Sequence, residues 1–549
     1  MAIFCIAKQR VIRSLNALGD KLLLNQWYAD GGTLGFWLAD GELVLRTLSL
    51  SLKELGLSLG WPKVHSTRQL QLSPAFGFGG KPRVLGQDKV YKVMGVPVMG
   101  TQEAVKAFFG SKLRKVEALM QGILALEDVH RGYALLRYTV SFCKVVYLMR
   151  AMPLTAFDGL FHDFLVAFDN LQYEYLGKIL RIGAIGNAER LQVGLALSKG
   201  GFGMRSALRH ANAAFVAGCV AAAPLVGKLF NPDGQPFVDP RLEAALERYN
   251  RDTGREEGSP ENLTLEGLAA LAPYQDTLSA ALDAADSARY LELRPGQVHE
   301  VRMRSLAEPH AATFLQALPD PEQNLLLSNQ EFTTYCCFRL GRVPHEGAPC
   351  PVCRNANLDE NGDHQVSGCV KGHHRYRRHN ELLDEVARHA VRAGLQVFKD
   401  CSITLSNSRQ RPSDLTIRRF ANAKDASVDL IVFNPLAPSH LNPAADGQEL
   451  KAATRVEASK VRKYAALFAN QTTVEFMPMA ATVYGGWGPG AENVIETILA
   501  AEADALHMKP GPLRFRLYAR LGAILARCNA RAILDRRPTH LRQALANAE

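Results

Sequence analysis

Residues 350–380 read CPVCRNANLDENGDHQVSGCVKGHHRYRRHN, and this stretch contains a complete set of zinc-type ligands. Cys350, Cys353, His364 and Cys369 have the spacing C-x2-C-x10-H-x4-C. Zinc prefers four thiolate or imidazole ligands in a tetrahedron, and a C-x2-C pair turns both sulfurs toward one ion. We therefore predict a small knuckle with structural Zn2+ and no open coordination position. The alternative is a reduced C-x-x-C in a loop, but no thioredoxin-like βαβ pattern favours a redox role.

The residues that follow the knuckle are strongly basic. The candidates for nucleic-acid binding are Lys371, Arg375, Arg377, Arg378, His379 and Asn380. His373 and His374 could compete as zinc ligands, but their Lys/Arg-rich surroundings favour phosphate contacts. Phosphate binding would make the affinity salt-dependent. The alternative is a solvated charged surface, which is the usual meaning of a run of charges.

A second basic run occupies residues 509–542 near the C-terminus. It contains Lys509, Arg514, Arg516, Arg520, Arg527, Arg531, Arg536, Arg537 and Arg542, against Asp535 alone. Because only one acidic residue accompanies so many arginines, the run favours contacts with phosphate. The run also permits a nuclear-localisation interpretation, although such patterns are common by chance.

Two aspartates and a basic helix form a candidate nuclease site. Asp414 precedes one strand-like run and Asp429 lies in the next, so both can reach one Mg2+ or Mn2+ ion. Such an ion polarises a phosphate and lowers the pKa of a water molecule. Lys460, Lys463 and Tyr464 begin a helix-like run, and a lysine there could stabilise the developing charge. The alternative is that Asp414 caps a turn and Asp429 lies at a strand edge.

Near the N-terminus, residues 26–35 read QWYADGGTLG and predict a hairpin with Asp30 at its turn. Apolar periodicity predicts a helix over 40–57, a mostly helical region over 103–230 and acidic helices over 261–330. Further on it predicts a helix over 380–393, strands at 415–417 and 428–433, a helix over 450–469, a strand over 474–484 and helices over 491–547. Residues 231–240 and 254–260 read as linkers.

Together these strings resemble non-LTR retrotransposon polyproteins that carry a restriction-like endonuclease. Residues 26–35 resemble the aromatic-x-Asp-Asp hairpin of reverse transcriptases. The segments 56–63, 93–100 and 191–206 resemble strings that follow it in the palm and thumb. The endonuclease part is resembled by four features in order. These are the knuckle, the string Arg378-His379-Asn380, the acids Asp414 and Asp429, and the string Gly485-Gly486-Trp487-Gly488.

The resemblance implies an α/β multidomain chain. Its parts would be a partial reverse-transcriptase palm (1–102), a helical thumb-like region (103–230) and an acidic helical connector (231–346). A zinc knuckle with the RHN motif (347–380) and a PD-(D/E)xK restriction-like α/β domain with basic C-terminal helices (381–549) would follow. The family's Lys lies on the helix after the second acid, which makes Lys460 or Lys463 the counterpart here.

Several residues depart from the family pattern. Gly31 stands where the second Asp of the polymerase hairpin is expected, and only 26 residues precede Trp27. One carboxylate, Asp30, does not hold two Mg2+ ions, so we predict no polymerase activity and an N-terminally truncated palm. Residues 480–483 also lack the acidic residue that relatives carry before the Gly-Gly-Trp string, which would weaken metal binding.

Length and composition agree with a multidomain, nucleic-acid-handling protein. The chain has 549 residues, 47% hydrophobic and 21% charged, which favours two to four folded domains. Its net charge is +12 over 1–230, −11 over 231–370 and +9 over 371–549, which gives +10 overall. Ten cysteines are too few for a disulfide scaffold. No signal peptide is visible and the apolar stretch 213–227 is too short to span a bilayer, so we expect a nuclear or cytoplasmic, non-secreted protein.

The leading hypothesis is a retrotransposon reverse transcriptase/endonuclease fragment with a lost polymerase and an Mg-dependent DNA-nicking endonuclease. Its partners would be DNA, RNA or both, with no membrane. The alternative is a non-catalytic, zinc-containing nucleic-acid-binding remnant, since the knuckle and the basic flanks suffice for that. A remnant with no cellular role is the third hypothesis.

Overall fold

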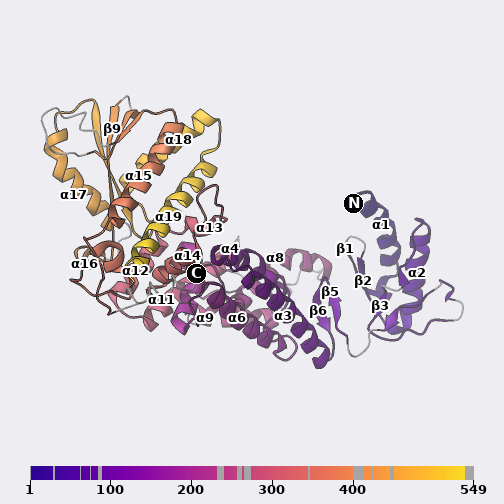
Figure 1. Ribbon diagram of the computed structural model, residues 1–549. Coiled ribbons are helices and arrows are strands. Elements are labelled where there is room, and N and C mark those ends of the chain that lie inside the picture. The colour runs from indigo at the N-terminus through magenta and orange to yellow at the C-terminus, as the bar shows by residue number, and fades with distance from the viewer. Residues whose placement is uncertain are drawn as a thin grey trace. The chain divides into compact units, whose positions relative to one another are not determined.

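The computed structural model describes most of the chain (Figure 1). The described residues are 2–28, 31–61, 64–73, 76–78, 80–84, 89–230, 240–255, 262–264, 267, 274–343, 347–399, 413–421, 424–444 and 451–537. Residue contacts divide the chain into two units. Unit 1 contains Met1–Arg114 and Thr155–Phe164; unit 2 contains Lys115–Leu154 and Leu165–Glu549. Both helices and small sheets occur, so the expected mixed α/β class is confirmed, while the finer division into five regions stays a prediction.

Unit 1 contains the predicted hairpin. Strands β1 (Leu22–Tyr28) and β2 (Gly31–Phe36) pair antiparallel, with Trp27 opposite Gly32. The Trp27 ring lies so close that a Cβ at Gly32 would meet it at 2.8 Å, which explains a glycine there. Helices α1 (Ala2–Asn16) and α2 (Gly41–Lys53) pack through Val11 and Leu48 and other apolar residues. Unit 1 also has the strand pairs β3 (His65–Ser66) with β4 (Arg83–Val84) and β5 (Tyr91–Val93) with β6 (Val96–Met99).

Two long helices run from unit 1 into unit 2, and the following part of unit 2 is helical as predicted. The two are α3 (Gln102–Leu124) and α6 (Leu160–Ile179). The others are α4 (Val129–Leu135), α5 (Val146–Ala151), α7 (Asn187–Gly194), α8 (Ala207–Phe230), α9 (Pro240–Asp252), α11 (Tyr274–Leu293), α12 (Gln297–Ala307), α13 (Thr313–Gln316) and α14 (Asn329–Leu340). The glycine-rich stretch 200–203 lies between α7 and α8. Most of both predicted linkers, 231–240 and 254–260, lies outside the described residues.

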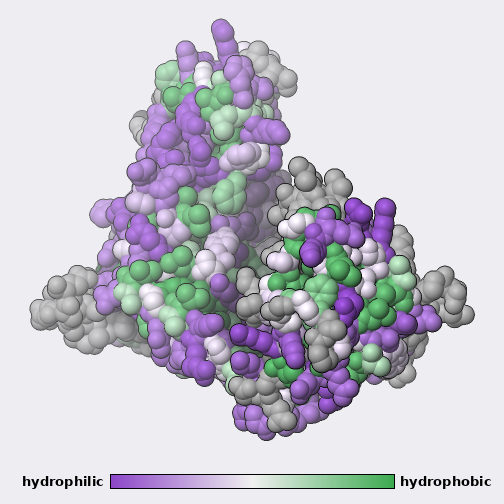
Figure 2. All heavy atoms as spheres, turned by 90° about the vertical axis from the view of Figure 1, so that its right-hand side faces the viewer, coloured by the Kyte–Doolittle hydropathy of each residue, from purple (hydrophilic) through white to green (hydrophobic). Residues whose placement is uncertain are grey.

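The apolar stretch 213–227 lies in α8, where Ala213, Phe215 and Val216 are buried against α9 and α11. Within the described part of the chain, no helix combines the length and the apolar character that crossing a bilayer requires. Hydrophilic side chains cover much of the face drawn in Figure 2, interrupted by small groups of hydrophobic residues.

The C-terminal part of unit 2 is a four-stranded sheet between helices. The strand order is β10 (Val474–Thr482), β9 (Lys424–Phe433), β8 (Leu415–Ala421), β7 (Val397–Lys399). β9 and β10 are parallel and are connected through α17 (Lys451–Phe468), whereas β7, β8 and β9 pair antiparallel. The remaining helices are α15 (His374–Arg392), α16 (Pro438–Ala444), α18 (Pro489–Leu506) and α19 (Pro510–Leu534).

The alternation of side chains along the strands assigns the two faces of this sheet. Val428 and Leu430 of β9 face one core, which they share with α15, α18 and α19. Phe433 of β9 and Ala480 of β10 contact Ala453 of α17 on the other face. Figure 1 shows α17 on one side of the sheet and α15 and α18 on the other. Asp429, between Val428 and Leu430, therefore faces α17.

Helix α15 corrects one prediction. It begins at His374, six residues before the expected start at 380, so the RHN motif lies inside its first two turns. The early start has a tertiary cause. Arg378 donates to the carbonyl of Val366 (3.3 Å) and to Asn529 Oδ1 (2.7 Å), and His374 Nε2 lies 3.2 Å from Asp535.

Candidate functional site

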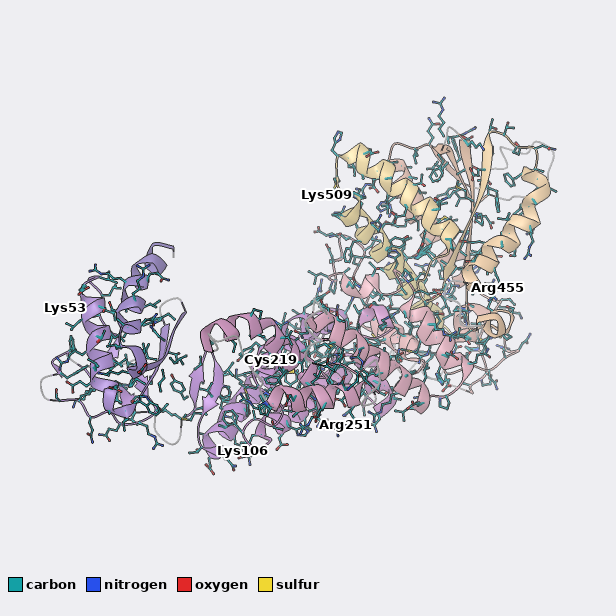
Figure 3. All side chains as sticks on the ribbon, turned by 180° about the vertical axis from the view of Figure 1, so that it is seen from behind. Lys53, Lys106, Cys219, Arg251, Arg455 and Lys509 are labelled. Carbon is teal, nitrogen blue, oxygen red and sulfur yellow. The ribbon has the colours of Figure 1, made fainter. Side chains whose placement is uncertain are left out.

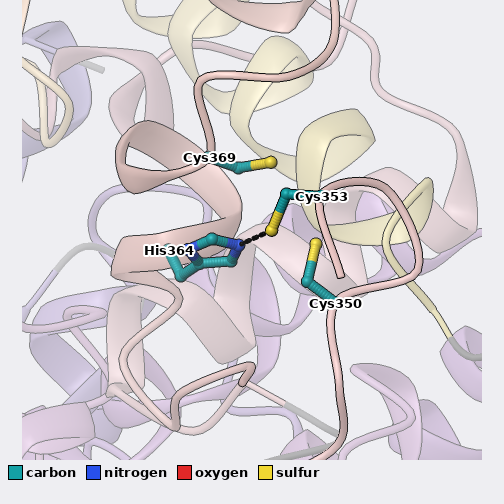
Figure 4. Close-up of side chains that lie close together, drawn as sticks. All are labelled: Cys350, Cys353, His364 and Cys369. Carbon is teal, nitrogen blue, oxygen red and sulfur yellow. Dashed lines mark hydrogen bonds between the residues drawn. The ribbon is translucent and has the colours of Figure 1, made fainter. Parts of the chain in front are cut away.

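The four predicted zinc ligands lie together. One ligand atom from each of Cys350, Cys353, His364 and Cys369 lies within 4.8 Å of all the others (Figure 4). Cys353 Sγ and His364 Nε2 are 3.3 Å apart. In the described part of the chain this is the one group of three or more Cys, His, Asp or Glu residues arranged to hold an ion. Three sulfurs and one imidazole suit a metal such as zinc.

The backbone builds this knuckle locally. Cys350 donates its N–H to Ala356 (2.9 Å) and accepts the N–H of Arg354 (2.9 Å), which closes the tight turn between the two cysteines. Asp359 accepts the N–H groups of Asp363 (2.9 Å) and His364 (2.8 Å). The turn that presents His364 is thus held by a carboxylate inside the same stretch.

The thiols of the C-x2-C pair differ electrostatically. The N–H of Asn355 lowers the pKa of Cys353, and the neighbouring thiols add to this effect. Burial raises the pKa of Cys350 and lowers the pKa of His364. Zinc binds a neutral imidazole and deprotonated thiols, and the directions of the pKa shifts of His364 and Cys353 favour these forms.

The knuckle is joined to the sheet and to the last helix. Asn434, directly after β9, donates to Asp363 Oδ1 (2.7 Å), and burial raises the pKa of Asp363 to about 6. Arg536, two residues after α19, donates to the carbonyl of Lys371 (3.2 Å). The knuckle therefore packs as part of unit 2.

The second predicted cluster also converges. Asp414 donates its N–H to the carbonyl of Val428 (2.8 Å), and its Oδ2 accepts the N–H of Leu430 (2.8 Å). These two bonds hold Asp414 against the backbone on both sides of Asp429. Lys460 Nζ lies 2.8 Å from Asp429 Oδ2.

His379 joins this carboxylate cluster from the start of α15. Its Nε2 lies 3.1 Å from Asp414 Oδ2 and 3.1 Å from the carbonyl of Leu430. Burial acts against its protonation, but the hydrogen bond and charge of Asp414 outweigh it and raise the pKa of His379. The sequence predicted His379 as a nucleic-acid contact, and its place beside Asp414 was not foreseen.

Asp429 is the more buried acid, with 6% of the residue exposed. Burial raises the pKa of Asp429, and the charge of Asp414 raises it further, against the opposing effects of Lys460 and His379. Asp414 is close enough to act electrostatically on Asp429, and carboxylates are among the hard oxygen ligands that Mg2+ and Mn2+ prefer.

The structure separates the two candidate lysines. Lys460 points at Asp429, whereas Lys463 is exposed and its ammonium lies over the Tyr464 ring, 4.8 Å from the centroid. Tyr464 is 6% exposed and packs edge-on against Phe476 of β10. The geometry thus gives Lys460 a role at the acids and Tyr464 a packing role.

Glu457, one turn before Lys460 on α17, was not predicted from the sequence. It is 6% exposed, and its carboxylate accepts the N–H groups of Ala480 (3.0 Å), Gly490 (3.0 Å) and Ala491 (3.2 Å). It therefore fixes α17 to β10 and to the first turn of α18, where N–H groups lack helical partners.

Gly488, which ends the quoted Gly-Gly-Trp string, and nearby Gly490 leave room for Glu457. A Cβ at Gly488 would lie 2.3 Å from Glu457 Oε1, and a Cβ at Gly490 would lie 3.1 Å from its Cδ. Two glycines so close together in the sequence indicate that another group approaches the backbone here. That is the signal by which the contact with a buried side chain could have been predicted.

The predicted nucleic-acid-binding residues do not form one surface. Arg378 is 3% exposed with its guanidinium bonded inside the protein, so its position does not support a direct phosphate contact. Asn380 lies 3.2 Å from His379 Nδ1, and Arg377 pairs with Glu381 (2.7 Å). Lys371 and Arg375 are exposed and make no ion pair with a carboxylate among the described residues.

Many of the C-terminal arginines are used inside the protein. Arg531 pairs with Glu331 (2.6 Å), Arg520 with Glu385 (2.8 Å) and Arg514 with Glu496 (2.7 Å). Arg536 is 2% exposed, and Arg542 lies outside the described residues. Figure 3 shows Lys509, near the start of α19, well separated from Arg455 on α17. Much of the basic run therefore forms contacts within the protein, and fewer of its arginines are available for phosphate than the sequence suggested.

Asp30, the remaining site candidate, lies outside the described residues, although the two strands on either side are present as predicted. No protein-family model matches the chain, and a search of curated proteins gave no match either. The arrangement of the residues themselves therefore carries the functional argument.

Proposed function

We propose that this chain is a metal-dependent endonuclease that nicks DNA, in a polypeptide of the non-LTR retrotransposon type. The observation that carries the proposal is the pairing of Lys460 with Asp429, with Asp414 bonded to the next residue, Leu430. Asp414 directly precedes β8, Asp429 lies in the neighbouring strand β9, and the lysine lies on the helix where the resemblance expects it.

Asp414 and Asp429 would hold Mg2+ or Mn2+, which supplies Lewis acidity and a more acidic water. The donor set fits, because such ions are bound by one or two carboxylates together with water and phosphate oxygens. The N–H of Leu430 orients the Asp414 carboxylate before any ion binds, and Lys460 orients that of Asp429.

Lys460 would place a positive charge beside the phosphate as negative charge develops, and its pairing with Asp429 keeps it oriented before substrate binds. His379 would hold the Asp414 carboxylate in one rotamer and could take up a proton near the scissile bond. Glu457 touches none of the reacting groups and would act by positioning Lys460.

For the N-terminal part we propose a reverse-transcriptase palm without polymerase activity. The antiparallel hairpin with Trp27 on Gly32 supports a palm-like ancestry. Gly31 at the position of the second acid argues against two-metal catalysis there.

The proposal is tested by nicking of supercoiled plasmid in the presence of Mg2+ or Mn2+. We expect the wild-type chain to convert it to open circles, and Asp414→Ala or Asp429→Ala to lower the rate by about 100-fold or more. DNA binding should be retained in both variants. Equal nicking by wild type and variants would show that the activity lies elsewhere or is a contaminant.

The second candidate is a non-catalytic zinc-containing nucleic-acid-binding protein, and the Cys/His cluster favours it. Retained DNA binding without nicking by any form of the chain, under either metal, would select this function over the first.

A further inference from the structure

We propose that the segment between the knuckle and α15 binds single-stranded nucleic acid by stacking a base on Tyr376. We call the surface formed by Val370, Lys371, Arg375 and Tyr376 the Tyr376 surface. It requires none of the residues assigned to hydrolysis, so it stands or falls independently of the proposed nuclease.

Two large side chains on this short segment are unusually exposed. Tyr376 is 75% exposed and Val370 is 79% exposed, the largest exposures among the large hydrophobic residues described. An isolated exposed side chain has little meaning by itself, but two such exposures within seven residues set this segment apart from the rest of the described chain. Tyrosine offers a flat ring on which any base can stack.

The cations on the Tyr376 surface are uncompensated. Lys371 and Arg375 are exposed and pair with no carboxylate among the described residues. Glu381, the acid one turn further along α15, is already engaged in a pair with Arg377 (2.7 Å). An exposed ring directly after exposed Arg375, with Lys371 five residues earlier, complements a phosphate backbone with accessible bases.

The backbone of this segment is held in place. The carbonyl of Lys371 accepts a hydrogen bond from Arg536 (3.2 Å). Buried Arg378 fixes the first turns of α15 to Val366 and Asn529. A rigid backbone under exposed side chains lowers the ordering cost of binding, because few new torsions have to be fixed.

The exposed tyrosine ring favours binding of a single strand over binding of a duplex. Stacking on a ring requires an unpaired base, whereas a duplex offers its bases only as groove edges. The sugar is not selected by any contact of the described residues, so DNA and RNA single strands share the chemistry and the experiment separates them.

The test is the binding of labelled oligonucleotides of about ten nucleotides, measured by fluorescence anisotropy with the full, zinc-loaded chain and no added Mg2+. Single-stranded DNA, single-stranded RNA and duplex DNA of one sequence are compared. We expect Tyr376→Ala to weaken single-strand binding by about tenfold or more, and Tyr376→Phe to stay within about twofold of wild type. Duplex binding should change little.

Phe515→Ala is the matched control. Phe515 is 43% exposed between Arg514 and Arg516, but Arg514 is neutralised by Glu496. Its replacement should leave binding unchanged. In the Lys371→Ala/Arg375→Ala double variant, the slope of log affinity against log salt concentration should become shallower by about 1.4.

The proposal is overturned if Tyr376→Ala binds single strands as tightly as wild type. It is also overturned if Tyr376→Phe loses as much affinity as Tyr376→Ala, or if the duplex loses as much as the single strand. Zinc content and thermal unfolding measured on the same samples identify any variant that is misfolded; in that case the Tyr376→Phe comparison decides.

Discussion

The Cys/His knuckle and the carboxylate cluster use opposite chemistry and are built in opposite ways. The knuckle takes all four ligands from twenty consecutive residues and offers soft sulfur donors. The carboxylate cluster takes His379 from α15, Asp414 from the residue before β8, Asp429 from β9 and Lys460 from α17. A local motif fixes its own geometry, whereas a dispersed one depends on how the helices pack on the sheet.

The two clusters are nevertheless connected through α15. Cys369 and His379 are only ten residues apart, and Arg378 ties the helix to the knuckle at Val366. The knuckle therefore supports the element that brings His379 to Asp414. This connection is what the following predictions are designed to break or to sharpen.

The largest effect is expected from removing the knuckle metal. Cys353→Ala should abolish stoichiometric zinc binding and lower the melting temperature by several degrees, because metal binding to such a site contributes folding free energy. Nicking should be lost with it, since α15 loses its support. Zinc analysis and thermal unfolding measure this, with exposed Cys143→Ala as the control that should change neither. Full nicking by a zinc-free, folded variant would disprove the connection.

A similarly large effect, confined to activity, is expected at Lys460. Lys460→Ala should slow nicking by about 100-fold, because the charge beside Asp429 is removed. Lys463→Ala, three residues along the same helix, should retain nicking within about threefold, since Lys460 and not Lys463 pairs with Asp429. The plasmid-nicking rates of the two variants test this assignment. Slower nicking by Lys463→Ala than by Lys460→Ala would show that Lys463 is the active lysine.

A smaller effect is expected at Glu457, which positions Lys460. Glu457→Gln should slow nicking by about tenfold and leave DNA binding unchanged, because an amide does not accept all three N–H groups. Gly488→Ala should behave alike, since its Cβ would collide with the same carboxylate. The exposed acid of β10, Glu475→Gln, is the control. If Glu457→Gln nicks at the wild-type rate, α17 is held by other contacts.

The smallest effect concerns pH and stability at Asp429. Its pKa is raised in the folded state by burial and by Asp414, so its ionisation costs stability above that pKa. Asp429→Asn should therefore melt at most about two degrees higher than wild type at pH 7. The difference should vanish as the pH falls below the ordinary range of an aspartate, where both folded and unfolded forms are protonated. A lower melting temperature for the variant at pH 7 would mean that the pair with Lys460 outweighs burial.

The sequence predicted the local elements of this comparison well. The knuckle ligands, the hairpin at 22–36, the strands around Asp414 and Asp429 and the helix with Lys460 follow from spacing and periodicity. These signals are local, because periodic burial and turn residues depend on neighbours in the chain. The two acids could be nominated, since strands next to each other in sequence commonly pair.

What the sequence did not predict depends on distant partners. The choice between Lys460 and Lys463 needs the rotation of α17 against the sheet. The early start of α15 depends on Asn529 and Asp535, over 150 residues away. The carboxylates that neutralise Arg514, Arg520 and Arg531 likewise come from elsewhere in the chain, so a basic run looked like a phosphate-binding surface.

The most direct test of two separate metal sites is Mn2+ binding to the zinc-loaded chain, followed by electron paramagnetic resonance in wild type and Asp429→Ala. Zinc content is measured on the same samples. We predict that wild type binds Mn2+ and that the variant loses this binding while keeping its zinc. Mn2+ binding unchanged by Asp429→Ala, or lost only together with zinc, would contradict a carboxylate metal site at the sheet.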